Sequence, residues 1–128
     1  MNKFYKEICK YYEDIFPTNE AQLNFLNNIS DGKDYLDIGC ATGLVAKNLE
    51  NLGKNVTCID LEQSMVEEAR KKGLKVYEKN MLELDFEEKF DVCYCIGTTI
   101  AHLEDINQIC SFILKTMGLL KENGKLVL

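Results

Sequence analysis

The chain has 128 residues, 46% of them hydrophobic and 28% charged, which is the length and composition of one globular domain with one core. Its net charge of −6 disfavours a nucleic acid as the main partner, because a phosphate backbone requires a basic face. No apolar run approaches the roughly 18 residues of a membrane span, and the charged first residues do not form a secretory signal.

The six cysteines lack the C-x-x-C spacing, and the chain has a single histidine. We therefore expect no metal site, because structural zinc needs four closely spaced Cys or His ligands. Several cysteines fall within apolar runs, where a free thiol packs as a small hydrophobic side chain. Reduced cysteines indicate a cytoplasmic location.

The first segment carries apolar side chains at helical spacing. The repeat runs from Phe4 to Ile15, includes Tyr11 and Tyr12, and predicts an amphipathic helix whose stripe is buried. Pro17 ends this helix, because proline lacks the backbone N–H that a helix interior needs.

Thr18 is expected to cap a second helix, which ends at residues 30–32. We interpret residues 1–32 as an N-terminal helical cap segment. Residues 33–128 are interpreted as a single ligand-binding core domain.

In the core, apolar runs alternate with helical repeats. Strands are expected at Asp34–Ile38, Asn55–Asp60, Leu74–Glu78, Phe90–Ile96 and Lys125–Leu128. Helices are expected between them, at Leu44–Leu52, at Met65–Lys72 behind a capping box at Ser64, and after Asp105. This alternation predicts the α/β class, with a parallel, doubly wound sheet and right-handed crossovers.

Two of these helices have a clear apolar stripe that we expect to face the sheet. In the first helix the stripe is Leu44, Val45, Asn48, Leu49 and Leu52. In the last helix it is Ile106, Ile109, Cys110, Ile113, Leu114 and Met117.

Residues suited to ligand binding follow the expected strands. Gly39, Asp60, Asn80 and Gly97 each lie just past a strand end. Parallel strands bring their carboxyl ends to one edge of the sheet, where such folds bind ligands. The sequence therefore predicts a single site at this edge.

The chemistry of this edge suits an adenosine-containing ligand. Gly39 and Gly43 carry no Cβ, so the backbone can turn sharply and approach a ligand closely. The helix that opens near Thr42 offers N–H groups without intrahelical partners. Asp60 can accept two hydrogen bonds from a ribose diol.

Two ligands use a glycine turn with an acidic strand tip: dinucleotides and S-adenosylmethionine. Dinucleotide sites follow G-x-G-x-x-G, whereas Ala41 stands here in place of the middle glycine and the third glycine comes one residue early. Asp37 would repel a pyrophosphate but accepts a hydrogen bond from an amino group, directly or through water. S-adenosylmethionine is favoured, and an NAD-dependent oxidoreductase remains the alternative.

From about Tyr11 to its end, the chain resembles the class I S-adenosylmethionine-dependent methyltransferases. The segments that match the family's signatures are Asp37-Ile38-Gly39-Cys40-Ala41-Thr42-Gly43, Ile59 to Met65, Asn80-Met81-Leu82, Phe90-Asp91-Val92 and Cys95 to Leu103. The last segment is similar to that of glycine and sarcosine N-methyltransferases, which implies a small-molecule methyl acceptor.

The resemblance also implies a strand order of 3-2-1-4-5 in a Rossmann-like sheet and a set of residues around S-adenosylmethionine. In that set, Asp60 holds the ribose, Leu61 and Met65 lie near the adenine, and Asn80 stands where the family more often has Asp. The whole expected cofactor-binding set is Asp37, Gly39, Cys40, Ala41, Gly43, Asp60, Leu61, Met65, Asn80, Met81, Leu82, Ile96 and Gly97.

No catalytic residue is assigned. His102 is the candidate, either as a general base for the acceptor or as a polar residue that fixes its loop. Asp91 is interpreted as a carboxylate that fixes strand geometry.

The resemblance implies a seven-stranded sheet, whereas this sequence ends within the fifth strand. We expect either a truncated form that lacks the terminal hairpin or a fifth-strand edge that a second copy covers. A non-catalytic S-adenosylmethionine-binding module is therefore a further alternative to an enzyme.

Overall fold

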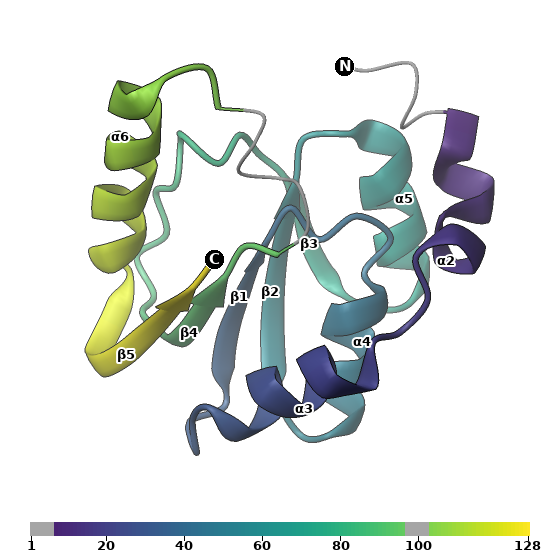
Figure 1. Cartoon of the computed structure of the whole chain (residues 1–128), viewed down its shortest axis with the longest axis horizontal. Coiled ribbons are helices and arrows are strands. Elements are labelled where there is room, and N and C mark those ends of the chain that lie inside the picture. Colours follow the sequence, from purple (N-terminus) through teal and green to yellow (C-terminus); the bar gives the residue numbers. More distant parts are fainter. Residues whose placement is uncertain (1–6, 97–102) are drawn as a thin grey trace.

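The computed structural model describes residues 7–96 and 103–128 (Figure 1). The described elements, in chain order, are the 3-10 helix η1 (Cys9–Tyr11), α2 (Tyr12–Ile15), α3 (Glu20–Asn28), β1 (Asp34–Ile38), α4 (Leu44–Asn51), β2 (Asn55–Asp60), α5 (Gln63–Lys71), β3 (Lys75–Glu78), β4 (Phe90–Tyr94), α6 (Ile106–Met117) and β5 (Leu120–Val127).

The strands form one sheet in the order β3-β2-β1-β4-β5, and every pairing in it is parallel. This confirms the predicted α/β, Rossmann-like architecture and its strand order. The register places Asp37 of β1 beside Cys58 of β2 on one side and beside Tyr94 of β4 on the other. The carboxyl ends of these three strands therefore meet at one edge.

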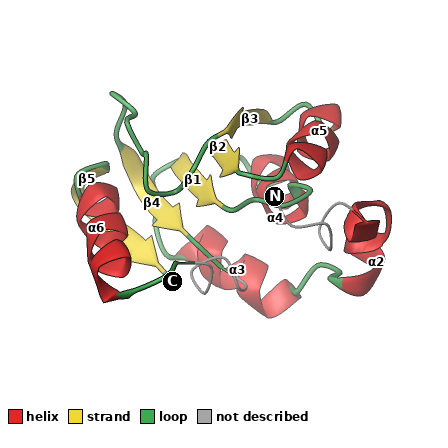
Figure 2. Cartoon of the chain, turned by 90° about the horizontal axis from the view of Figure 1, so that it is seen from above, coloured by secondary structure: helices red, strands yellow, loops and turns green. Residues whose placement is uncertain are grey.

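The sheet separates two hydrophobic cores. Helices α3, α4 and α5 cover one face, where Leu26, Leu49 and Val66 are buried against the strands. On the other face, Phe112 of α6 and Leu84 of the β3–β4 connection are buried. Figure 1 shows α6 on the opposite side of the sheet from α4 and α5, and Figure 2 shows the same arrangement from above.

Two helices begin one or two residues away from the expected cap. Asn19, not Thr18, caps α3, because its extended backbone lets its side chain accept from the Gln22 N–H at 3.0 Å. The expected capping box at Ser64 is also wrong. Glu62 precedes α5, and its carboxylate accepts from the Ser64 hydroxyl at 2.9 Å and from the Ser64 N–H at 3.5 Å.

The N-terminal stripe is not buried as predicted. Tyr11 is 62% exposed and Ile15 is 53% exposed, while Cys9 is the buried residue of this short segment. The described part of the segment contacts the start of α5, where the Cys9 thiol donates to the Ser64 carbonyl. Ile8 and Tyr12 are half-buried, so the described part of the stripe is only partly covered.

The helical stripes facing the sheet are also only partly correct. In α6, Phe112 and Thr116 are buried, whereas Ile106, Leu114 and Met117 are 68%, 70% and 57% exposed. The helix lies over the β4–β5 side of the sheet, and only a narrow part of its surface packs against the sheet there. In α4, Leu49 is buried as expected, but Ala46 replaces Leu52 in the core.

The last strand starts earlier than expected. It begins at Leu120, and its pairing with β4 skips from Leu120 to Lys125 while β4 advances by two residues. Asn123, with φ of 65°, lies in the resulting bulge, so the expected turn lies inside the strand. No helix among the described residues is long and apolar enough to cross a membrane.

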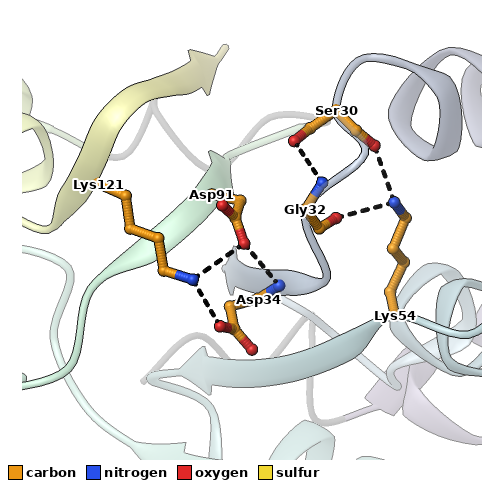
Figure 3. A network of polar contacts seen from close by, with 6 residues as sticks. All are labelled: Ser30, Gly32, Asp34, Lys54, Asp91 and Lys121. Atoms are coloured by element: carbon orange, nitrogen blue, oxygen red, sulfur yellow. Dashed lines mark hydrogen bonds and ion pairs between the residues drawn. The ribbon is translucent and has the colours of Figure 1, made fainter.

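The amino edge of the sheet is held by a polar network (Figure 3). Asp91 accepts from the Asp34 N–H at 3.0 Å and from the Lys121 ammonium at 3.2 Å. Lys121 also pairs with the Asp34 carboxylate at 2.7 Å. Gly32 packs so closely on the Asp91 carboxyl that no side chain fits there. Asp91 thus fixes strand geometry, as expected.

Candidate functional site

The site is built around the loop between β1 and α4. Gly39, Ala41 and Gly43 all have left-handed backbones, with φ of 77°, 52° and 82°. The N–H groups of Gly39 and Cys40 donate to the Ile59 carbonyl of β2 at 2.9 and 3.0 Å. The loop is therefore anchored to the neighbouring strand before helix α4 begins.

Gly43 also has a packing reason to be glycine. A Cβ there would clash with Leu74 and approach the Ala69 Cβ at 3.1 Å. The missing side chain therefore lets α4 start against α5, independently of any ligand. The first turn of α4 has no side-chain cap, so its N–H groups remain available at the site.

Asp60, the last residue of β2, ties the glycine loop to the next helix. Its carboxylate accepts from the Ala41 N–H at 2.8 Å through one oxygen and from the Glu62 N–H at 2.9 Å through the other. Burial raises the pKa of this carboxyl, while the backbone N–H groups of Glu62, Ala41 and Leu61 act in the opposite direction. A carboxylate accepts about four hydrogen bonds, so Asp60 can also accept from a ligand hydroxyl.

Asp37 lies deeper, at the carboxyl end of β1. It is 2% exposed, and its carboxylate accepts the Tyr94 phenol at 2.7 Å. Burial raises the pKa of Asp37 to about 7, and the nearby Asp60 acts in the same direction. The two carboxyls share one site, so a positive charge on a ligand is favoured there.

The loop cysteine also faces inward. Cys40 is 8% exposed; its thiol donates to the Ala41 carbonyl at 3.4 Å and contacts the fully buried thiol of Cys58. This contact and burial raise the pKa of Cys40, so it stays a neutral thiol.

The segment after β3 makes a compact turn at the same edge. The Asn80 side-chain oxygen accepts from the Leu82 N–H at 2.8 Å, and the Asn80 carbonyl accepts from the Glu83 N–H. Met81 and Leu82 are half-buried against the core that contains Phe112. One lone pair of the Asn80 oxygen is thus already used by the turn.

The apolar members of the expected set differ in exposure. Leu61 is 49% exposed beside Asp60, whereas Met65 is 2% exposed. Ile96 is half-buried against the core on the face that α3, α4 and α5 cover. Leu61 is therefore accessible to a ligand surface, and Met65 contributes mainly to packing. Gly97 and His102 lie outside the described residues.

Two residues of this edge escaped the sequence reasoning. Tyr94 reads as one more apolar position of β4, and its role depends on its register beside Asp37. Glu62 is 5% exposed, and its second carboxylate oxygen is buried without a hydrogen-bond partner among the described residues. The sequence signal available for Glu62 was a second acidic residue two positions after Asp60.

The comparisons with known proteins agree with this geometry. Residues 36–124 match the family model of the methyltransferase domain. The chain belongs to this methyltransferase domain family. The match runs from within β1 to within β5 and includes every described residue of the expected site.

Sequence relatives are longer methyltransferases. A ubiquinone biosynthesis O-methyltransferase from Rickettsia conorii is 34% identical over 115 residues, which are 85% of this chain and 38% of that protein. The mitochondrial ubiquinone biosynthesis O-methyltransferase of Schizosaccharomyces pombe is 30% identical over 125 residues, covering 86% of this chain and 44% of that protein. The chain thus spans less than half the length of these two curated relatives.

Solved structures show the same fold. The CcbJ methyltransferase from Streptomyces caelestis superposes with a TM-score of 0.83 at 20% identity, over 94% of this chain and 54% of that one. An S-adenosylmethionine-dependent methyltransferase from Clostridium acetobutylicum gives a TM-score of 0.78 at 25% identity, over 97% and 56%.

Proposed function

We propose that this chain binds S-adenosylmethionine at the carboxyl edge of β1, β2 and β4 and serves methyl transfer to a small-molecule acceptor. The observation that carries the proposal is the buried carboxylate of Asp37 and the half-buried carboxylate of Asp60 beside a left-handed glycine loop in a methyltransferase domain. When bound, S-adenosylmethionine supplies a methyl group on a positively charged sulfur. Acidic side chains suit this cation and would repel a pyrophosphate.

Different residues of the site bind different parts of the ligand. Asp60 accepts the ribose hydroxyls through its remaining lone pairs, and the Gly39–Gly43 loop lies against the methionine portion. Leu61 offers an exposed apolar surface to the adenine. Asn80 and the Met81 N–H bind the adenine edge, and Asn80 keeps one acceptor lone pair for this purpose.

Methyl transfer needs little further chemistry from the protein. A neutral amine or an ionised hydroxyl is already nucleophilic, and alignment of donor and acceptor contributes roughly 7–11 kcal/mol to lowering the barrier. His102 remains the candidate for a general base, should the acceptor have to lose a proton.

Titration calorimetry with S-adenosylmethionine and with NAD, each on the same protein, tests the ligand. We expect heat of binding with the first and none with the second, because of Ala41 and Asp37. Binding of NAD instead would favour the oxidoreductase alternative. The ubiquinone methyltransferase relatives and the glycine N-methyltransferase resemblance disagree on the acceptor, so both phenol and amine acceptors should be offered.

Asp60→Ala is the first variant to titrate. Loss of a charge-assisted hydrogen bond of about 1.5–3 kcal/mol weakens binding by roughly ten- to a hundredfold or somewhat more. Asp60→Asn keeps an acceptor for the Ala41 or Glu62 N–H and separates binding from folding, which circular dichroism monitors. Asp34→Ala, at the other edge of the sheet, is the control. Unchanged affinity in Asp60→Ala would remove this residue from the site.

Turnover separates an enzyme from a binding module. Since the chain covers 38–48% of its first curated relatives, we expect weaker cofactor binding and little or no methyl transfer by these 128 residues. Transfer of a labelled methyl group to a phenol or amine would measure it. Robust methylation would contradict this expectation and exclude the binding-module alternative.

We also propose that a second copy of the chain covers the β5 side. Among the described strands, β5 ends the sheet, and the neighbouring α6 exposes Ile106, Leu114 and Met117. Sedimentation at increasing concentration tests this, with Leu114→Glu expected to weaken association and Lys115→Glu as its control. A monomer at all concentrations would refute it. The cytoplasmic location, the absence of nucleic-acid and membrane partners, and the division at residue 33 stay predictions.

A further inference from the structure

Three cationic residues follow one another at the end of α5, and each has a different partner. Arg70 donates to a backbone carbonyl of β3, and Lys71 pairs with Glu68 at the surface. Lys72 instead reaches the loop between β1 and α4, where its ammonium donates to the Thr42 carbonyl at 2.9 Å. Lys72 is thus the member of this run that contacts the candidate site.

The peptide group that joins Thr42 to Gly43 is held at both ends. Its carbonyl accepts from Lys72 at 2.9 Å, and its N–H donates to the Cys40 carbonyl at 2.9 Å. The C=O and N–H of a trans peptide point in opposite directions, so the two hydrogen bonds together fix the rotation of this group. A rotated peptide group would lose both bonds.

The turn that contains this peptide group has a costly backbone. Ala41 carries a Cβ at φ of 52°, in the left-handed region that residues other than glycine seldom adopt. Such a conformation persists only where the surrounding contacts enforce it. Asp60 provides one contact by accepting from the Ala41 N–H at 2.8 Å, and Lys72 provides another at the carbonyl of the next residue.

A second acceptor keeps the Lys72 ammonium beside the loop. Glu13 of α2 pairs with Lys72 at 2.6 Å, and the side chains of Lys72 and Glu13 are 23% and 39% exposed. The neighbouring Lys71 side chain is 72% exposed, so solvent and salt screen its pair with Glu68 more strongly. Lys72 therefore has two fixed partners, one of them in the loop.

We propose that Lys72 is a positioning residue for the loop that receives S-adenosylmethionine, with Glu13 as its counter-ion. Lys72 holds the Thr42–Gly43 peptide group in one orientation and so keeps the turn at Ala41 in the shape that the ligand meets. Without Lys72, the loop populates other conformations, and the apparent affinity falls with the fraction of molecules that keep the competent one. This inference rests on the proposed function, which puts the methionine portion of the ligand at this loop.

Lys72→Met tests the inference, because it keeps the apolar part of the side chain but cannot donate. Titration calorimetry should show about tenfold weaker binding of S-adenosylmethionine, as expected for the loss of one charge-assisted hydrogen bond. The second probe, 5′-methylthioadenosine, lacks the amino-acid portion and should bind almost unchanged. Lys72→Arg, which still donates and still pairs with Glu13, should restore most of the affinity. Lys71→Met on the same helix is the matched control and should bind both probes as the wild type does.

The counter-ion has a smaller expected effect. Glu13→Gln leaves the bond between Lys72 and Thr42 in place and should weaken binding of S-adenosylmethionine by about two- to threefold. Because Glu13 acts through Lys72, adding Glu13→Gln to Lys72→Met should weaken binding no further than Lys72→Met alone. Full additivity of the two variants would exclude Glu13 as the counter-ion of this loop contact.

Amide exchange in the ligand-free protein reports on the loop itself. The Gly43 amide should exchange faster in Lys72→Met, while the Leu49 amide inside α4 keeps its wild-type rate. A merely structural role predicts that both amides exchange faster together and that both probes lose affinity by the same factor.

Unchanged affinity of Lys72→Met for S-adenosylmethionine, or unchanged exchange of the Gly43 amide, would overturn the inference and leave the proposed function standing. If S-adenosylmethionine does not bind the folded wild-type protein, the proposed function is refuted, and the inference with it.

Discussion

Strand β1 carries an aspartate near each end, and the two have opposite environments. Asp34, at the amino end, is half-exposed and pairs with Lys121 at 2.7 Å (Figure 3). That hydrogen bond lowers the pKa of Asp34. Asp37, three residues later, is buried beside Tyr94 and pairs with no cation in the part of the chain that the structure describes, and burial raises its pKa to about 7.

The difference separates a carboxylate that stabilises the fold from one that is available to a ligand. At the amino edge, the Lys121 ammonium pairs with the carboxylates of Asp34 and Asp91, and Asp91 also accepts from the Asp34 N–H. These carboxylates therefore already have partners within the fold. At the carboxyl edge, Asp37 and Asp60 lie close together, and the charge of Asp60 makes the ionisation of Asp37 more costly. Uncompensated charge of this kind is typical of functional sites.

The largest change in the free energy of unfolding is expected for Asp37→Asn in the ligand-free protein. The native Asp37 binds its proton more tightly folded, with a pKa of about 7, than unfolded, near 3.8. The wild-type protein therefore loses stability as the pH rises from about 4 to 7, and the loss is complete above that range. Asp37→Asn removes this loss, so its free energy of unfolding should exceed that of the wild type by roughly 2–4 kcal/mol at pH 8.

Urea unfolding at pH 4 and pH 8 measures the effect, and Asp34→Asn is the matched control on the same strand. Because its folded pKa is lowered, Asp34 contributes stability that is present above its unfolded pKa and lost as the pH falls through the folded value. Asp34→Asn should therefore never stabilise the protein. A lower stability of Asp37→Asn at pH 8 would show that its carboxylate is compensated.

Gly32→Ala should disrupt the polar network at the amino edge and lower the stability of the protein by an intermediate amount. The new Cβ would clash with the Asp91 carboxyl, which cannot move without losing the Asp34 N–H and Lys121. Overpacking of this kind costs about 1–3 kcal/mol. Gly118→Ala is the control, because its Cβ would meet its nearest atom, the Lys115 carbonyl oxygen, at 3.3 Å. Equal urea midpoints for the two variants would mean that the network adapts easily.

Much of the carboxyl edge could be predicted from sequence because its signals are local. The alternation of apolar runs with helices predicted the parallel sheet, and the left-handed backbone at Gly39 and Gly43 favours glycine. Asp60 could be placed because a strand ended there. The contacts of these residues with a ligand stay predictions.

Tyr94 and the exposed face of α6 could not be predicted in the same way. Tyr94 meets Asp37 across 57 residues of sequence, through a register that only the assembled β1–β4 pair defines. The stripe of α6 is a genuine apolar repeat, but its burial depends on which neighbours the helix has. Ile106 and Leu114 are exposed because the described chain places no other element over them. Periodicity identifies an apolar face without naming its partner.

Lys121→Ala should lower the stability of the protein least among these variants. It tests the ion pairs at the amino edge directly. Lys121 pairs with Asp34 and Asp91 at the surface, where solvent and salt screen the attraction. We expect a slight fall in thermal midpoint at low ionic strength and no fall in 1 M salt, where the attraction is screened. The affinity for S-adenosylmethionine should not change, because the proposed cofactor site lies at the other edge of the sheet. Lys71→Ala, which breaks an exposed pair with Glu68 on α5, is the control. A salt-independent loss as large as that of Gly32→Ala would mean that Lys121 does more than neutralise two surface carboxylates, and the contrast between the two ends of β1 would be weaker than the structure indicates.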